Sequence, residues 1–521
     1  MKSLPLLLTA ALLLGACSDF LEDELLSETS ADFLYNTPEG LEAGVVGLYS
    51  LARELDLDGE WNNARSWTLT AKSDIAFGRT GEISLYSRLG WGREVGDFGA
   101  KRFSRFWRHY YRVADRANAV IQGLERVEGL DDDRRNQLLA EARIHRAEAY
   151  FTLYRLFNNI FVTTEPTTPE NVFDPPSAPS SPAEIFALVN GDLDFAIANL
   201  APEPEAVGRY TQGAARHVRA KTAMWQEDYA TAAEQAETLI EEGEYRLVPQ
   251  TRFVFTNDLL NTETIFSRQL SDGLVGGGNR NQIHFNVIPQ YNAVRGATLS
   301  IDNGGRGTGL LMPNQYLLSL LDEDPDDTRD QDTYYKRFYL YNDPERLPDG
   351  VEFGDTIRTA TPNSDDPNVY QLYYRTQNPG VLKFLNEDAD PTEAGTSKNL
   401  IVYRLAETYL ISAEAHWRLG DDAKGLERLN AIRNRAGAAD YTSIDLTAIL
   451  DERARELAFE GQRWYTLKRT NTLVSQIRQY AGNDNFRNEA RERIEPRHRN
   501  FPIPESELDV LGAGYPQNEG Y

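Results

Sequence analysis

The sequence predicts a mainly α-helical protein built from antiparallel helix pairs, with large irregular loop insertions and little β-structure. Several stretches carry apolar residues at helical spacing and are joined by very short turns. Two long segments, at about 55–100 and 245–400, are instead rich in residues that favour turns. Hydrophobic residues make up 41% of the 521 residues, which is enough to bury a core and excludes general disorder.

The clearest helix pair lies near the C-terminal third. The stretch Tyr403–Leu419 predicts one helix, because its apolar residues recur at steps of four, three and four and form a single stripe. The members of this stripe are Ala406, Leu410, Ala413 and Trp417. Gly420 breaks the pattern, and Ala423–Ala436 predicts the partner helix, which ends at Gly437.

A second pair covers Thr211–Trp225 and Tyr229–Glu242, with Gly243 as its stop. Further helices are predicted at Arg102–Arg126, Asp132–Phe157, Pro182–Leu200 and Leu446–Leu473. The resulting framework, about 101–245 and 400–475, is similar to a degenerate tetratricopeptide-like array without a regular repeat period. Any helical domain with short connections is the alternative.

The two loop-rich segments interrupt this framework. Within the second, short β-type runs predict strands at Arg252–Phe255, Tyr334–Tyr341 and Tyr370–Arg375. Long loops on a rigid scaffold are where binding residues usually lie. We therefore expect the segments at about 55–100 and 245–400 to form the ligand-binding regions.

The N-terminus predicts a processing signal. Residues 1–16 have a charged start and an apolar run too short to span a membrane. The sequence Leu14-Gly15-Ala16-Cys17 is similar to the lipobox of bacterial lipoproteins. We therefore expect cleavage before Cys17, lipidation of its thiol, an acidic tether over 17–30 and a single body over 31–521. An accidental cysteine in an ordinary signal peptide is the alternative.

Charge and cysteine content exclude several classes. The formal net charge of −26 argues against broad nucleic-acid binding, because the overall field repels a polyanion. Cys17 is the only cysteine, so intramolecular disulfides and zinc sites built on paired thiolates are excluded. The same charge disfavours strongly anionic ligands, unless a local basic patch such as Arg79, Arg88 and Arg93 overrides it.

No catalytic residues are predicted. The sequence contains no Gly-x-Ser-x-Gly elbow, Walker loop or His-Glu-x-x-His motif. Glu456 and Glu460 would share a face of the predicted Leu446–Leu473 helix, and such a carboxylate pair could serve a glycosidase. Arg453 and Arg463 flank them, so a salt-bridge ladder is the favoured interpretation.

No metal site or cofactor is predicted either. Glu141, His145 and Glu148 share a helix face, but neighbouring arginines favour a surface of ion pairs. The acidic run Asp322–Asp330 fails as a calcium loop, because it lacks glycine at the sixth position and glutamate at the twelfth. We expect this run to be a solvated acidic turn. The glycine-rich pieces at 276–278 and 304–309 are interpreted as flexible loops.

Aromatic residues in the loops are the stronger candidates for function. Rings placed among polar residues can stack on the apolar faces of sugars, while arginine and asparagine donate hydrogen bonds to hydroxyl groups. The candidates are Trp61, Trp67, Phe77, Tyr86 and Trp91, with Tyr291 from the second loop-rich segment. The alternative for each ring is local packing within a long loop.

The stretch Arg455–Arg469 reads Arg-Glu-Leu-Ala-Phe-Glu-Gly-Gln-Arg-Trp-Tyr-Thr-Leu-Lys-Arg. It looks like the signature helix of the SusD/RagB family, which the sequence resembles over nearly the whole chain after Cys17. The other matching stretches are Cys17–Leu21, Trp107-x-x-Tyr110-Tyr111, Ala117-Asn118, Tyr403–Glu407, Leu429–Gly437, Phe501–Leu508 and Gln517–Tyr521. Glu519 stands where the family has a proline in its C-terminal tail.

The resemblance implies four tetratricopeptide-like hairpins and an irregular ligand-binding region. It also implies a lipid anchor in the outer membrane, facing outward, and a non-enzymatic role as the lid of a SusC-like TonB-dependent transporter. The usual ligands in the family are glycans. The sugar site of the family lies between the first helices, which by position suggests Arg79, Tyr86 and Trp91, with Tyr291 from the later loops.

The first hypothesis is therefore a cell-surface protein that binds a glycan, or another oligomeric nutrient, and delivers it to such a transporter. A lipid-anchored glycoside hydrolase is the second hypothesis. A protein-interaction scaffold without a small-molecule site is the third.

Overall fold

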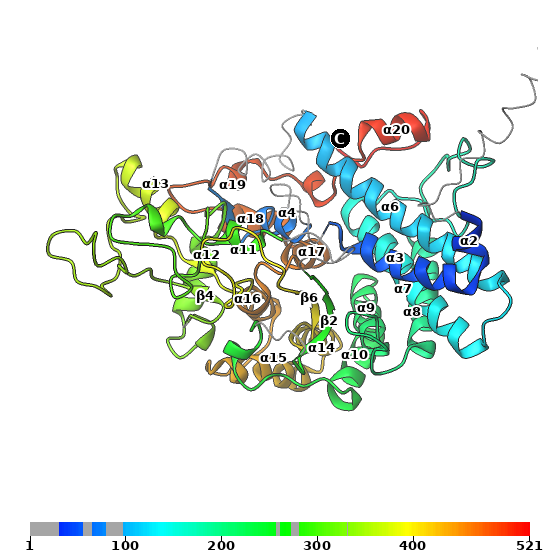
Figure 1. Cartoon of the computed structure of the whole chain (residues 1–521), viewed down its shortest axis with the longest axis horizontal. Coiled ribbons are helices and arrows are strands. Elements are labelled where there is room, and N and C mark those ends of the chain that lie inside the picture. The colour runs from blue at the N-terminus through cyan, green and yellow to red at the C-terminus, as the bar shows by residue number, and fades with distance from the viewer. Residues whose placement is uncertain (1–30, 56–64, 80–96, 257–260, 272–280, 331) are drawn as a thin grey trace, which may run out of the picture.

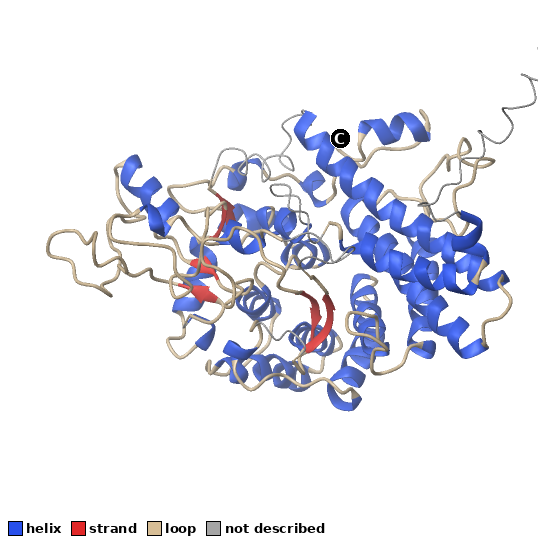
Figure 2. Cartoon of the chain, viewed as in Figure 1, coloured by secondary structure: helices blue, strands red, loops and turns tan. Residues whose placement is uncertain are grey.

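The computed structural model describes residues 31–55, 65–79, 97–256, 261–271, 281–330 and 332–521. Helices fill one side of the molecule, and loops with three short strand pairs form much of the other (Figures 1 and 2). The predicted class, mainly α-helical with large loop insertions and little β-structure, is confirmed. Among the described helices, none combines the length and apolar character that crossing a membrane requires.

The first group of helices forms a continuous stack on the right of Figure 1. Each long helix packs on the next one, from α3 through α6, α7, α8 and α9 to α10. The group consists of α2 (Ala31–Asn36), α3 (Pro38–Arg53), α6 (Asp97–Arg126), α7 (Asp132–Phe157), α8 (Pro182–Asn199), α9 (Gln212–Trp225) and α10 (Tyr229–Glu237). The last turn, Thr238–Glu242, is π-helical. The predicted helices over 102–242 are therefore confirmed to within a few residues.

Local signals set the ends of these helices. Asp131 caps α7 by accepting from the Arg134 amide, and Thr211 caps α9 in the same way. Ser181 and Glu184 form a complete capping box at the start of α8. Each cap satisfies amide groups that would otherwise lack partners, so short connections can follow directly.

A second group of helices packs on the first through α10 and α14. It consists of α14 (Leu405–Arg418), α15 (Asp422–Ala436), α16 (Leu446–Leu457), α17 (Arg463–Arg469) and α18 (Leu473–Tyr480). The pair α14–α15 is the hairpin predicted from the sequence, and Gly437 ends α15 with a left-handed φ of 75°. Trp464 of α17 and Phe501 then pack together in the largest apolar core, with ring centroids 5.4 Å apart.

The helix predicted over Leu446–Leu473 was wrong in its middle, where the chain breaks between α16 and α17. Phe459 and Gly461 both have positive φ, which a continuous helix cannot accommodate. Lys383, which is distant in the sequence, donates to the backbone carbonyls of Glu456 and Ala458. It therefore satisfies carbonyl groups that the break leaves without a helical partner. Glu456 and Glu460 consequently do not share one helix face.

The loop-rich half contains small elements tied together by three antiparallel strand pairs, β1–β3, β2–β6 and β4–β5. The strands are β1 (Ala76–Gly78), β2 (Thr264–Arg268), β3 (Leu311–Pro313), β4 (Tyr335–Lys336), β5 (Gly380–Val381) and β6 (Leu400–Arg404). The short helices outside the two groups are α4 (Arg65–Ala71), α11 (Ile283–Val287), α12 (Gln315–Asp322), α13 (Pro367–Thr376), α19 (Ala490–Arg493) and α20 (Glu505–Leu511).

Two of the three predicted strand runs were wrong. Tyr370–Arg375 lies in α13, which starts with a capping Asp366 and Pro367 at the first turn. The run at 252–255 begins in a 3-10 turn, Thr251–Phe253. Only Tyr334–Tyr341 contains a strand, the two-residue β4. At 370–375 the aromatic residues alone therefore predicted a strand, although helix-start signals lie just before them.

Candidate functional site

Three arginines and a group of aromatic rings meet in the loop-rich half, and together they are called the arginine–aromatic cluster. Its members are Arg79, Arg375 and Arg487 with Phe77, Tyr370, Tyr373, Tyr374 and Phe486. They come from the end of β1, from α13 and from the loop before α19. Figure 1 shows α13 and α19 on the same side of the molecule.

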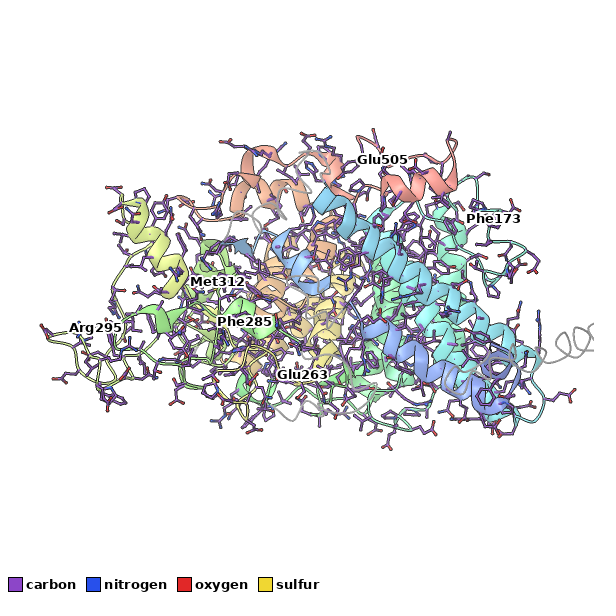
Figure 3. All side chains as sticks on the ribbon, turned by 45° about the horizontal axis from the view of Figure 1, so that its top comes forward. Phe173, Glu263, Phe285, Arg295, Met312 and Glu505 are labelled. Atoms are coloured by element: carbon purple, nitrogen blue, oxygen red, sulfur yellow. The ribbon has the colours of Figure 1, made fainter. Side chains whose placement is uncertain are left out.

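The β1 strand positions the first arginine. Phe77 pairs in register with Met312 of β3, which Figure 3 labels in this half of the molecule. The Arg79 amide extends the pairing to the Leu310 carbonyl at 2.9 Å. Its guanidinium donates to the carbonyls of Thr308 and Gly309, both at 2.9 Å. Arg79 is thereby fixed in place while remaining half-buried.

The other two arginines are tied to the same region. Arg375 is exposed and donates through Nε to Gln290 Oε1 at 2.6 Å. Arg487 is half-buried, donates through Nε to the Arg79 carbonyl at 3.1 Å, and lies 4.9 Å from the centre of the Phe486 ring. Burial first, and then the charges of Arg375 and Arg487, lower the pKa of Arg79, which indicates that the three cations are close.

The aromatic rings form a packed base beside these cations. Tyr374 and Phe486 stack with centroids 4.6 Å apart, and Phe77 meets Tyr374 edge-on at 5.3 Å. These three rings are buried, whereas Tyr370 and Tyr373 of α13 are half-buried. The cluster therefore combines a rigid apolar base with partly accessible phenol rings.

The structure places the sequence-predicted ligand residues unevenly. Arg79 belongs to the cluster, and Trp67 lies in α4. Tyr291 has 0% of its surface exposed, stacks on Tyr339 at 5.2 Å and accepts from the Ser300 amide, so its ring presents no face to a ligand in this structure. Six of the positions named from the sequence lie outside the described residues: Cys17, Trp61, Tyr86, Arg88, Trp91 and Arg93.

Glu456 lies in a buried network of ion pairs. Its carboxylate accepts from Arg404 at 2.6 Å, from Arg329 at 3.1 Å and from Arg435. Burial raises its pKa, but the three arginines outweigh burial and hold the pKa well below its usual value. Arg404 also forms ion pairs with Glu263, which Figure 3 labels, and with Glu460.

Ion pairs therefore hold Glu456 and Glu460, but the ladder with Arg453 and Arg463 that helical spacing predicted does not form. Arg453 pairs with Glu407 at 3.5 Å, and Arg463 pairs with Asp74 at 2.6 Å, so neither flanks Glu456 as the helical spacing suggested. A carboxylate with 0% exposure and three guanidinium partners cannot reach a glycosidic bond.

The set Glu141, His145 and Glu148 is buried or half-buried, which corrects the surface predicted for it. Glu141 pairs with Arg209 at 2.9 Å, and Glu148 accepts from two tyrosine hydroxyls. His145 lies between the rings of Tyr49 and Tyr210, and burial lowers its pKa well below the usual value. Within the described residues, no group of three or more potential ligands is placed to hold a metal ion.

The acidic run Asp322–Asp330 was predicted to be solvated, and this was wrong for its centre. Asp327 is 2% exposed and accepts from Arg329, which also reaches Glu452 at 2.6 Å. The run therefore anchors one end of the ion-pair network rather than facing solvent throughout.

A cavity of 910 Å³ opens between α6 and α20. It is lined by Glu54, Arg105, Arg108, His109, Arg112, Glu505 and Asp509, among others. Arg108 pairs with Glu507 at 2.7 Å and Arg112 pairs with Glu54, so cations and carboxylates are matched there. The sequence-predicted ligand residues that the structure describes do not line it.

Two family models match most of the chain. A model described as SusD family matches residues 262–521, and one described as starch-binding associating with outer membrane matches residues 19–223. A SusD-like protein, P25, of Formosa agariphila is 25% identical, covering 95% of this chain and 94% of that protein.

Solved structures share the fold over almost the whole length. One titled as a laminarin-binding SusD-like protein gives a TM-score of 0.72 at 23% identity, covering 94% of this chain and 100% of that one. The surface glycan-binding protein A from Bacteroides thetaiotaomicron, in complex with laminarihexaose, gives 0.70 at 20% identity, covering 93% and 100%. At these identities, the structural likeness establishes the fold alone.

Proposed function

This chain belongs to the SusD/RagB family, and from that membership we propose that it is a cell-surface lipoprotein that binds a glycan and delivers it to a SusC-like TonB-dependent outer-membrane transporter. The observation that carries the proposal is the juxtaposition of Arg79 with aromatic rings at the end of β1. The named ligands of two structural neighbours, laminarin and laminarihexaose, are glycans and support the same ligand class.

Capture would be noncovalent. Aromatic rings would stack on the apolar faces of sugar rings, and guanidinium groups would donate hydrogen bonds to hydroxyl oxygens. We assign Trp61, Trp67, Tyr86 and Trp91 to this surface alongside Arg79, because they belong to the same loop-rich segment of the sequence. Tyr291 is left out of the proposed surface because it is buried.

The role of transporter lid follows from the family resemblance. As the lid, the protein would close over the transporter with its ligand facing inward, and closure would keep the captured glycan from diffusing away. No segment of the described chain is assigned to this contact.

Binding without hydrolysis is favoured by two observations. The relatives named above are SusD-like or glycan-binding proteins. In this chain the carboxylates suggested for a glycosidase, Glu456 and Glu460, are held by Arg404 in the ion-pair network. Retaining glycosidases need one carboxyl group with a raised pKa, and Glu456 has the opposite shift.

Replacing Trp91 with alanine is expected to weaken glycan binding by about tenfold, because stacking of one ring on a sugar contributes roughly 1–3 kcal/mol by analogy with base stacking. Isothermal titration calorimetry with a glycan that the wild-type protein binds measures the change in affinity. Thermal unfolding of the variant should match that of the wild type. Unchanged affinity would remove Trp91 from the proposed surface.

Replacing Cys17 with serine is expected to release the protein from the outer membrane, because lipid chains, rather than basic attraction, are proposed to hold a chain with a net charge of −26. Surface labelling of intact cells and assay of the culture supernatant measure retention. Equal retention of variant and wild type would contradict the anchor.

A further inference from the structure

Within the part of the chain that the structure describes, the three arginines of the arginine–aromatic cluster have no carboxylate partner. Among the described residues, no carboxylate oxygen lies within ion-pair distance of Arg79, Arg375 or Arg487. Within the described chain, their guanidinium groups donate to three backbone carbonyls and to one glutamine side chain. Two carboxylates act on the tyrosines of the cluster, and each has another arginine as its partner: Asp484 pairs with Arg491 at 3.0 Å, and Asp322 pairs with Arg337.

This arrangement differs from that of arginines elsewhere in the chain. Arg404 reaches three carboxylates, and Arg463 is held by both oxygens of Asp74. In a protein with 80 acidic and 54 basic residues, a group of cations without acidic partners is not the default outcome. Like charges placed together raise the free energy of the unliganded protein, and a bound anion relieves that cost.

The guanidinium groups also retain unused donors. Arg375 and Arg487 each use only Nε in their recorded hydrogen bonds within the described chain, which leaves both terminal nitrogens of each. Arg79 uses Nε and Nη2 and leaves Nη1. Two terminal nitrogens in a planar fork match the paired oxygens of a carboxylate or a sulfate ester.

The rings beside these donors suit a sugar that carries such a group. Tyr370 and Tyr373 are partly accessible on α13, the same helix that presents Arg375. A pyranose could therefore contact a ring with one face while its acidic substituent meets the arginines. The remaining acidic surface is screened beyond about 10 Å at 0.1 M salt, so local cations decide the interaction.

Resting on the proposed function, we propose that the glycan bound by this protein is anionic, and that Arg79, Arg375 and Arg487 receive its carboxylate or sulfate ester groups. The patch suggested from the sequence, Arg79 with Arg88 and Arg93, is not tested, because Arg88 and Arg93 lie outside the described residues. Within the described chain, Arg79 lies near two arginines from distant segments instead.

The test is calorimetry of the full chain with three hexasaccharides: neutral laminarihexaose, an oligogalacturonate and a sulfated galactan fragment. The variants are Arg375→Gln and Arg487→Gln. Arg116→Gln is the matched control, because Arg116 is exposed on α6 and makes one long hydrogen bond to the Tyr35 hydroxyl at 3.3 Å. Circular dichroism checks that each variant folds.

Binding of either anionic oligosaccharide is expected to exceed that of laminarihexaose. Each cluster variant is expected to weaken anionic binding by about tenfold, and the control to leave it unchanged. The affinity of the wild type should also fall as salt is raised from 50 to about 300 mM. If the oligogalacturonate binds more tightly, the acidic group recognised is a carboxylate; if the sulfated galactan fragment does, it is a sulfate ester.

Two results would overturn the inference. If laminarihexaose binds at least as tightly as both anionic ligands, or if both cluster variants bind the anionic ligand like the wild type, the arginines do not recognise an acidic group. In the first case the proposed glycan-binding function stands. If no oligosaccharide binds, the proposed function fails together with the inference.

Discussion

Replacement of Glu456 with glutamine is expected to lower the free energy of unfolding by about 3–5 kcal/mol, the usual cost of removing one partner from a buried ion pair. Glu456 is fully buried and accepts hydrogen bonds from Arg329, Arg404 and Arg435. Glutamine keeps the shape but removes the charge, so the three guanidinium groups lose a shared counter-ion. Equilibrium denaturation with urea, followed by circular dichroism, measures the change.

A matched exposed site separates this effect from the loss of charge alone. Glu427 is 59% exposed and pairs with Arg428 at 3.2 Å and Lys424 at 3.4 Å on α15. Glu427→Gln is expected to cost less than about 1 kcal/mol, because water already screens the pair. Equal costs at both positions would show that the buried network contributes no more than a surface pair.

Replacement of Asp74 with asparagine is expected to have a comparable effect on stability and an additional effect on binding. Asp74 is fully buried and holds Arg463 through both carboxylate oxygens, at 2.8 and 2.6 Å. Loss of its charge leaves Arg463 without its carboxylate partner and should cost about 3–5 kcal/mol. Because Asp74 precedes β1, the change should also disturb Arg79 and weaken ligand binding.

The control for this variant is Asp194→Asn. Asp194 is 61% exposed and pairs with Arg219 at 3.0 Å on the helical side of the molecule. We expect this control to change neither the urea midpoint nor the affinity appreciably. If Asp74→Asn retains full affinity in molecules that are still folded, the strand β1 does not position the ligand-binding arginine.

Helices were the part of the fold that the sequence could predict. Local features determine several of them: apolar spacing marks α14, capping side chains begin α7, α9 and α15, and Gly437 ends α15. The break after α16 was not predictable in the same way. It depends on Lys383 and Arg404, which are far away in the sequence and satisfy the carbonyls that the break exposes.

The candidate site could be predicted only in part, for a similar reason. Arg79 was named because the family resemblance indicated an arginine in that segment. Arg375 and Arg487 carried no local signal, since their relation to Arg79 exists only after α13 and the loop before α19 have packed together. The capping Asp366 and Pro367 could have identified α13 as a helix.

Burial of charge was the other feature that sequence spacing could not supply. Glu141 and Glu456 were expected on a solvated surface, yet each is buried against an arginine or a tyrosine from another element. Asp327 is buried against the nearby Arg329, which pairs in turn with Glu452 of α16. Such pairs are formed by tertiary contacts, and helical spacing predicted the wrong partners for Glu456. This buried network belongs to the scaffold that holds the binding loops.

The measurement that tests the central claim most directly combines binding with the fate of the ligand. The full chain is titrated calorimetrically with neutral and anionic oligosaccharides, and the sugar is recovered and sized by mass spectrometry after prolonged incubation. Capture without catalysis predicts saturable binding and a ligand recovered at its original length, with no new reducing ends. Absence of binding to every glycan, or recovery of shortened fragments, would contradict the claim.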